Sequence, residues 1–144
     1  MTTIVRTVTT SRPVAEVFAY LVDFTNATEW DAGTVSCSRT AGDGGVGTSY
    51  ENVSRFLGRE TTLTYVTQKV DPDREFVIRG QNKTVTSTDT LRMGSNSAGG
   101  TDVVYTAVFE FSGPARLLGP LLALPLKKLG DDAEKSLSKA LNSL

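Results

Sequence analysis

The first residues of the chain alternate in character, as the residues of a β-strand do. Residues 3–10 are mostly β-branched, and every second position shares one face of an extended chain. Apolar residues then recur at steps of three and four between Val14 and Val22, behind Ser11 as a capping residue and Pro13 in the first turn. This part of the chain therefore predicts one strand followed by a short amphipathic helix.

A second helix and a series of short strands follow. Residues 23–31 contain a capping Thr25 or Asn26 but have room for only a turn or two of helix, which Trp30 is expected to end. From residue 34 onward, strand-forming runs alternate with turns, which we place at residues 42–47, Gly58, residues 71–73, residues 80–83 and residues 94–100. Six strands at this spacing, added to the first one, predict a seven-stranded antiparallel meander.

The last two strands each have one mainly apolar face. In residues 101–112 most odd-numbered positions are apolar or aromatic. In residues 84–93 the odd-numbered positions are Val85, Ser87, Asp89, Leu91 and Met93. We expect both odd-numbered faces to point to the buried side of the sheet, which places Ser87 and Asp89 among apolar neighbours.

After Gly113 and Pro114 the apolar residues recur with the period of a long helix. The predicted apolar stripe consists of Leu118, Leu122, Leu126, Leu129, Ala133, Leu137, Leu141 and Leu144. Burying each leucine contributes roughly 2 kcal/mol, so the helix should be essential to stability. Pro120 and Pro125 are each expected to cost a helical hydrogen bond, and Gly130 is expected to weaken the middle of the helix.

Composition narrows the possible functions. A chain of 144 residues that is 39% hydrophobic fits one domain, residues 1–144, with a full core. The net charge of −1, with both signs scattered along the chain, predicts no nucleic-acid partner. No apolar run reaches the roughly 20 residues of a spanning helix, so we expect no stable membrane insertion. The N-terminus does not resemble a signal peptide, and the single Cys37 has no disulfide partner, which favours a cytoplasmic location.

The chain contains no histidine. This excludes Ser-His-Asp and Cys-His nucleophiles and histidine-ligated zinc. The sequence also lacks the glycine-rich nucleotide motifs and a CxxC pair, so we expect neither a cofactor nor a metal. Acid–base chemistry would depend on Asp, Glu, Lys or Tyr residues with shifted pKa values.

The order of the predicted elements resembles the START-like superfamily, whose fold is also called the helix-grip or birch-pollen-allergen fold. The stretch similar to the family's opening helices is SRPVAEVFAYLVDFTNATEWD. The stretches similar to its last two strands are TDTLRM and TDVVYTAVFEF. The proline-interrupted start of the C-terminal helix in the bacterial polyketide cyclase/dehydrase and lipid-transport branch resembles GPARLLGPLLALPLKKLG.

The resemblance implies an α+β fold in which a curved, seven-stranded antiparallel sheet wraps the C-terminal helix and leaves an apolar cavity. The main hypothesis is therefore binding or transport of a small hydrophobic molecule, such as a lipid, an isoprenoid, a sterol-like compound or a polyketide, by a monomer or weak homodimer. One alternative is a polyketide cyclase/aromatase or dehydratase-like enzyme that needs neither metal nor histidine; we consider catalysis the less expected case. Another is a protein-interaction module that exposes leucines of residues 117–129.

Candidate ligand contacts come from the apolar strand faces, the second helix and the start of the helical stripe. They are Trp30, Tyr50, Phe56, Tyr65, Ser87, Asp89, Leu91, Tyr105, Phe109, Leu118, Leu122 and Leu126. Asp89 is also the candidate catalytic acid, because burial raises the pKa of a carboxyl group. The structural alternative is an ion pair of Asp89 with Arg6 or Arg79, or a hydrogen bond to the backbone at the cavity mouth. A one-residue shift of strand register would move Asp89 to the solvent face.

Overall fold

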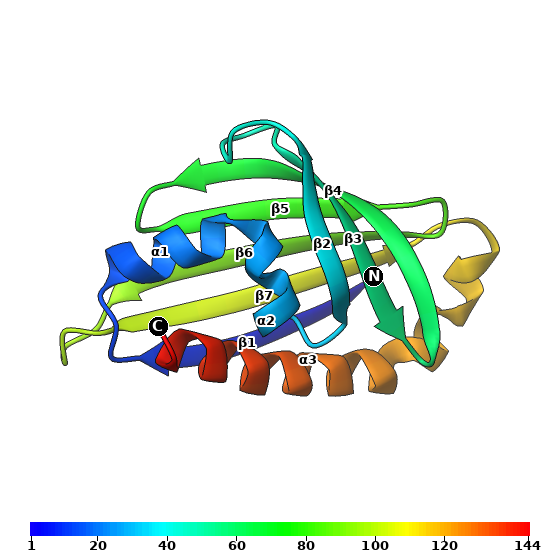
Figure 1. Cartoon of the computed structure of the whole chain (residues 1–144). Helices are drawn as coiled ribbons and strands as arrows, with labels where there is room; N and C mark the ends of the chain where they lie inside the picture. The colour runs from blue at the N-terminus through cyan, green and yellow to red at the C-terminus, as the bar shows by residue number, and fades with distance from the viewer.

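A computed structural model describes residues 1–144 as one antiparallel sheet, three α-helices and two short 3₁₀ segments (Figure 1). In chain order the elements are β1 (Thr2–Thr10), α1 (Val14–Val22), η1 (Phe24–Asn26), α2 (Ala27–Trp30), β2 (Thr34–Ala41), β3 (Ser49–Phe56), β4 (Arg59–Asp71), β5 (Glu75–Gln81), β6 (Val85–Ser95), β7 (Thr101–Phe111), η2 (Gly113–Leu118) and α3 (Gly119–Asn142). The predicted order of one strand, two short helices, six strands and a long helix is confirmed.

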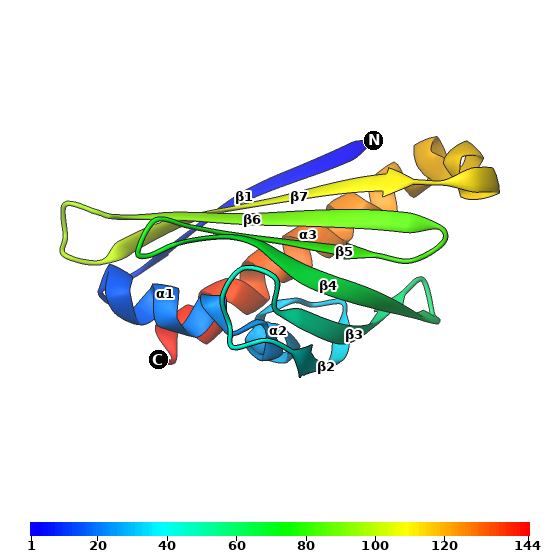
Figure 2. The ribbon, with the colours of Figure 1, turned by 90° about the horizontal axis from the view of Figure 1, so that it is seen from above.

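The seven strands form the predicted meander, in the spatial order β1-β7-β6-β5-β4-β3-β2. The first strand pairs with the last one, from Thr2 opposite Phe109 to Thr10 opposite Thr101. The register is irregular at two places in β2 and at one place in β4. Such irregularities bend a strand and increase its twist, and the β2–β3–β4 end of the sheet curls toward α2 (Figure 2).

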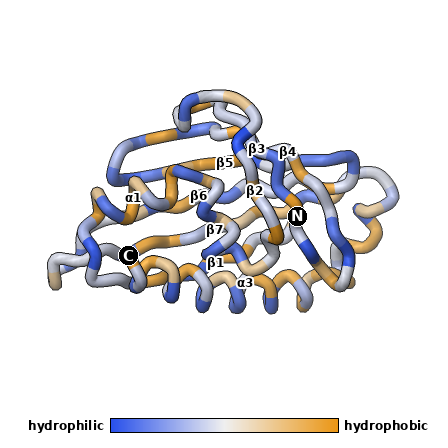
Figure 3. The backbone as a smooth tube through the Cα atoms, in the orientation of Figure 1, coloured by the Kyte–Doolittle hydropathy of each residue, from blue (hydrophilic) through white to orange (hydrophobic).

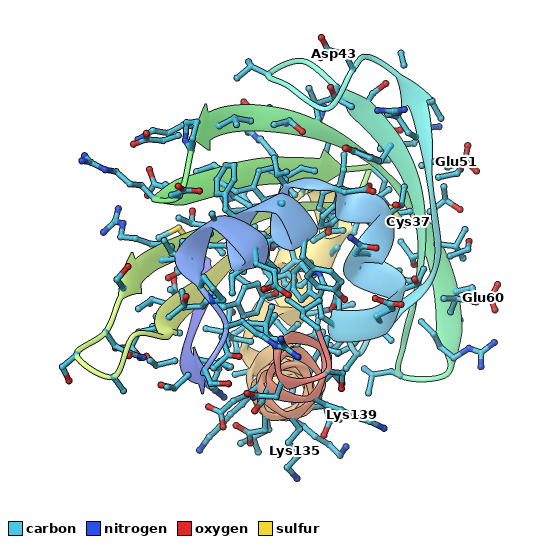
Figure 4. The ribbon with its side chains drawn as sticks, turned by 60° about the vertical axis from the view of Figure 1, so that its left-hand side comes forward. Cys37, Asp43, Glu51, Glu60, Lys135 and Lys139 are labelled. Atoms are coloured by element: carbon cyan, nitrogen blue, oxygen red, sulfur yellow. The ribbon has the colours of Figure 1, made fainter.

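The long helix α3 lies on the concave side of the sheet, where it packs on β1 and passes α2. Its buried residues are Leu126, Gly130, Ala133, Leu137 and Leu141, which include four of the eight residues of the predicted stripe. Leu122, Leu129 and Leu144 are partly buried against the core, and Leu118 is exposed. Lys135 and Lys139 point away from the sheet (Figure 4), and beyond its first two turns the outer edge of the helix is mainly hydrophilic (Figure 3). The amphipathic pattern of the sequence therefore orients the helix.

The expectation for Pro120 is wrong. Pro120 lies in the first turn of α3, where a backbone N–H has no intrahelical acceptor, so it costs no hydrogen bond. The irregular segment is η2, which comes before it. Pro125 does lie inside the helix, and α3 continues through it to Asn142.

Gly130 is buried at the point where α3 crosses β1. A Cβ atom there would collide with Cγ2 of Ile4 and approach the guanidinium of Arg6. The glycine therefore allows the close approach of helix and strand, a role beyond the low helix propensity that the sequence indicates.

We expect Gly130→Ala to lower the free energy of unfolding by about 2 kcal/mol, because overpacking outweighs the gain in helix propensity of about 1 kcal/mol. Urea denaturation measures this. Gly119→Ala is the matched control, since a Cβ at Gly119 meets no atom within 4 Å, and it should leave stability equal or higher. A stabilised Gly130→Ala variant would contradict the close packing.

Gly80 was predicted to begin a turn and instead lies within β5, opposite Tyr65 on β4 and Ser87 on β6. A Cβ at Gly80 would collide with the ring of Tyr65. The ring therefore lies over the glycine backbone, and the chain turns only after Gln81. This close approach positions one side chain of the site described below.

Candidate functional site

The helices α1, η1 and α2 fill only part of the concave face. Phe24 of η1 is fully buried, and its ring contacts those of Trp30, Tyr50, Tyr65 and Phe76, with centroid distances between 4.7 and 6.5 Å. α1 packs on β5 and β6 beside this cluster. The aromatic cluster closes that half of the sheet with packed side chains.

The other half of the concave face encloses a cavity of about 340 Å³. Its walls come from β3, β4, β6 and β7, and η2 with the first half of α3 covers it. Most lining side chains are apolar. Volume and lining are typical of a site for a small molecule.

The cavity runs from an exposed mouth to a buried polar end. Leu57, at the tip of the β3–β4 hairpin, and Leu118 of η2 line the mouth and are 63% and 49% exposed. We call the opposite side the polar end; it comprises Asp31, Tyr65, Ser87, Asp89 and Tyr105. Val85, Ser87 and Asp89 of β6 line the cavity in this order, from the mouth to the polar end.

Asp89 is 2% exposed, and its Oδ1 accepts a hydrogen bond from the Ser87 hydroxyl at 3.1 Å. The expected ion pair is wrong, because Arg6 binds Asp131 at 2.7 Å and Arg79 is exposed on β5. Burial, followed by the nearby charge of Asp31, raises the pKa of Asp89 to about 8, against the lowering effect of Ser87. Asp89 is therefore mainly protonated at pH 7.

Asp31, on the loop between α2 and β2, is a second carboxyl that lines the cavity, and it is partly buried. Nothing in the sequence marks it as a site residue. Its Oδ2 accepts a hydrogen bond from the Thr34 hydroxyl at 2.9 Å, and its Oδ1 accepts one from the N–H of Gly33 at 3.4 Å. Burial raises the pKa of Asp31 above its ordinary value, although both bonds act to lower it. Thr34 in turn accepts from the Asn52 amide at 3.1 Å. Asp31 thus has two hydrogen-bond donors and Asp89 only one, which favours the proton on Asp89.

Two tyrosines complete the polar end. Tyr65 and Tyr105 are 4% and 5% exposed, and burial raises the pKa of each well above its ordinary value, with Asp89 as the second cause. The ring of Tyr105 packs edge-on against Trp30 at 5.6 Å, which lies behind it in the core. The Tyr105 hydroxyl has no hydrogen bond within the protein and lines the cavity. It is therefore available to a bound molecule.

The structure places nine of the twelve candidate residues on the cavity wall: Phe56, Tyr65, Ser87, Asp89, Tyr105, Phe109, Leu118, Leu122 and Leu126. Trp30, Tyr50 and Leu91 do not line it; all three are at most 1% exposed in the core. They lie in the half of the concave face that Phe24 and α1 cover. Strand alternation predicts which face a residue occupies, but it does not predict which half of that face a helix fills.

The leucines of η2 and early α3 divide between two faces. Leu122, Leu126 and Leu129 line the cavity together with Leu118. Leu117, Leu121 and Leu124 are more than 70% exposed beside the mouth. The inner leucines therefore face the sheet and cover the cavity, as ligand binding requires. The outer leucines form the exposed apolar face that a protein-interaction module would need.

A sequence profile described as "Polyketide cyclase / dehydrase and lipid transport" matches residues 1–141. The chain belongs to this family. A search of curated proteins finds no match. No helix of the structure combines the length and the apolar character that crossing a membrane requires.

Solved structures show the same fold at low sequence identity. TTHA0849 from Thermus thermophilus is 16% identical, with a TM-score of 0.79 over 96% of each chain. The Zhui aromatase/cyclase from Streptomyces sp. R1128 is 17% identical, with a TM-score of 0.77 over 96% of this chain and 90% of its own. A START superfamily protein from Mycobacterium smegmatis is 11% identical, with a TM-score of 0.77 over 96% of each chain. The helix-grip fold is thus confirmed for this member of the family.

Proposed function

We propose that this protein binds a small, largely apolar molecule in the cavity between the sheet and α3, and holds or carries it as a single ligand-binding domain. The observation that supports this most is the cavity of about 340 Å³, with apolar walls and a buried polar end. A cavity of this kind orients a ligand, because apolar contacts supply affinity and a few polar groups fix its direction.

Filling the cavity tests the proposal. Ala107 of β7 is 1% exposed and lines the cavity, opposite Asp89 in the neighbouring strand. We expect Ala107→Phe to weaken binding of the neutral dye N-phenyl-1-naphthylamine by about tenfold or more, because the ring would occupy the ligand's space. Fluorescence titration measures this affinity.

Ala123→Phe is the matched control, because Ala123 is exposed on α3 and does not line the cavity. It should bind the dye as the unchanged protein does. Equal binding by both variants would place the dye elsewhere and count against the cavity. Native mass spectrometry of the purified protein, followed by solvent extraction, would then identify any retained ligand.

A catalytic function is the second candidate, and Asp89 is the observation that favours it. Its protonated carboxyl in an apolar cavity is suited to donate a proton to a ligand hydroxyl that leaves as water, or to a carbonyl that enolises. The Zhui structure carries the name aromatase/cyclase, and the family description includes cyclases and dehydrases. In this case Asp89→Asn should abolish turnover of a hydroxyl-bearing polyketide but retain dye binding.

A further inference from the structure

The polar end of the cavity carries acidic and hydroxyl groups but no basic group. The two arginines that line the cavity, Arg55 and Arg59, lie on the β3–β4 hairpin near the mouth. Arg55 is already paired with Glu60 at 2.6 Å. On the opposite wall, α3 contributes only leucine, glycine and alanine to the lining. Arg6 of β1 lies opposite Tyr105, but it is paired with Asp131 at 2.7 Å and does not line the cavity. A negative charge on a ligand would therefore find no unpaired cation at the polar end.

Two buried groups at this end retain free hydrogen-bonding capacity. Asp89 is 2% exposed, and only its Oδ1 is hydrogen-bonded, to Ser87. Tyr105 is 5% exposed, and its hydroxyl makes no hydrogen bond within the protein. Both side chains line the cavity. Neither side chain has a polar atom that is both buried and unpaired, so their free atoms are accessible from the cavity. A ligand that covers these atoms must therefore hydrogen-bond to them or leave them unpaired at a cost in free energy.

A carboxylate at the same place would be unfavourable for two reasons. It would lose its hydration without gaining a positive partner, and it would lie near the carboxyl groups of Asp31 and Asp89. Burial raises the pKa of Asp31, but hydrogen bonds from Thr34 and Gly33 favour its charged form. The charge of Asp31 is also the second cause of the raised pKa of Asp89. Like charges in a desolvated site repel strongly.

We propose that the polar end binds an uncharged hydroxyl or carbonyl group of the ligand, and that the cavity discriminates against molecules that end in a carboxylate. This inference rests on the proposed ligand-binding function. The Asp89 carboxyl and the Tyr105 hydroxyl each donate to a carbonyl oxygen or accept from a hydroxyl. Asp89 is suited to this because burial raises its pKa to about 8 and keeps it neutral at pH 7.

The size of the cavity guides the choice of probes. A cavity of about 340 Å³ is within the range of small-molecule sites. Decan-1-ol and decanoate are both smaller than the dye and differ from each other mainly in their polar group. Their displacement of N-phenyl-1-naphthylamine at pH 7 measures the preference.

We expect decan-1-ol to bind at least about tenfold more tightly than decanoate. An apolar cavity alone also favours the alcohol. The decisive result is therefore how the ratio of the two dissociation constants, decanoate over decan-1-ol, changes in Asp31→Asn. Removal of the charge should reduce the ratio about fivefold or more, through tighter binding of decanoate. Asp73→Asn is the control, because Asp73 is exposed on the turn between β4 and β5 and tolerates asparagine at its φ of 63°.

Asp89→Leu is a second, independent variant. It should weaken decan-1-ol about fivefold or more relative to the dye, because the ligand hydroxyl loses its partner. The inference is overturned if Asp31→Asn leaves the decanoate to decan-1-ol ratio unchanged and Asp89→Leu leaves decan-1-ol binding unchanged. It is also overturned if decylamine binds more tightly than decan-1-ol. If the dye itself does not bind, the proposed function fails; if the dye binds and the selectivity is absent, only this inference fails.

Discussion

Replacing Asp89 by asparagine should raise the free energy of unfolding at pH 8 by on the order of 3 kcal/mol. Asp89 is buried without a cation, and folding raises its pKa from an ordinary 3.8 to about 8. The two values differ by about 4, and each unit corresponds to about 1.4 kcal/mol, so about 5 kcal/mol is an upper limit. Relaxation of the site and water in the cavity reduce this value. Asparagine has nearly the same shape and carries no charge.

The effect has a definite pH dependence. Because its folded-state pKa is raised, Asp89 binds its proton more tightly in the folded protein. Its contribution to stability is fully present below about pH 4 and is lost as the pH rises toward about 8. The titratable neighbours, Asp31, Tyr65 and Tyr105, remain in both proteins, so the comparison reports Asp89 together with its coupling to Asp31. Urea denaturation of both proteins at pH 5 and pH 8 should give less than half the difference at pH 5.

The exposed control Asp73→Asn should change stability little at either pH. A loss of stability in Asp89→Asn at pH 8 would mean that the carboxylate has a favourable partner and would contradict the neutral carboxyl. Equal differences at pH 5 and pH 8 would show that Asp89 does not titrate in this range. Either result would also weaken the inference about uncharged ligands.

The largest destabilisation is expected for Phe24→Ala. Phe24 is fully buried, and its ring contacts four other aromatic rings, from α2, β3, β4 and β5. Removing a buried phenylalanine ring leaves a void and costs about 4 kcal/mol. Chemical denaturation followed by tryptophan fluorescence measures both stability and packing, because Trp30 is the only tryptophan and its ring lies 6.2 Å from Phe24.

Phe111→Ala is the matched control. Phe111 lies at the end of β7, lines the cavity and is only half-buried. Its truncation should cost clearly less than that of Phe24, because less surface leaves water on folding. Comparable losses in the two variants would contradict the role of Phe24 as the side chain that closes one half of the concave face.

Phe24 and Asp89 have opposite effects on the stability of the fold. The cluster around Phe24 stabilises the fold, whereas Asp89 reduces stability at neutral pH. A buried group that destabilises the free protein is expected where a site is prepared for a ligand. A ligand that bonds to Asp89 and Tyr105 would recover part of this cost, so bound ligand should raise the melting temperature.

The element order could be predicted from the sequence because the chain's periodicity is strong. Leucines at steps of three and four predict α3, and alternation with regularly spaced turns predicts the meander. Two positions have a role that the sequence alone does not indicate, for the same physical reason. In the sequence, Gly80 suggests a turn and Gly130 suggests a weak point of the helix. In the structure, each is a glycine because another side chain or strand lies against its backbone.

The candidate site was only partly predictable. Strand parity is a local property, so it placed Ser87, Asp89 and Phe109 on the inner face, and the structure puts all three on the cavity wall. The same parity placed Leu91 there, although α1 packs on that part of the sheet. The residues around Asp31 indicate only a turn, because its interaction with Asp89 joins two positions that are distant in sequence.

The sequence by itself determined the succession of elements, the inner face of the last two strands and the core-facing side of α3, because these follow from side-chain period and the hydrophobic effect. Only the tertiary structure decided that the helices fill one half of the concave face and leave the other half open. It also decided that Asp31 and Asp89 meet at the polar end without a cation. Cavities and buried charges depend on which side chains from separate elements meet in space, and packing in three dimensions decides that.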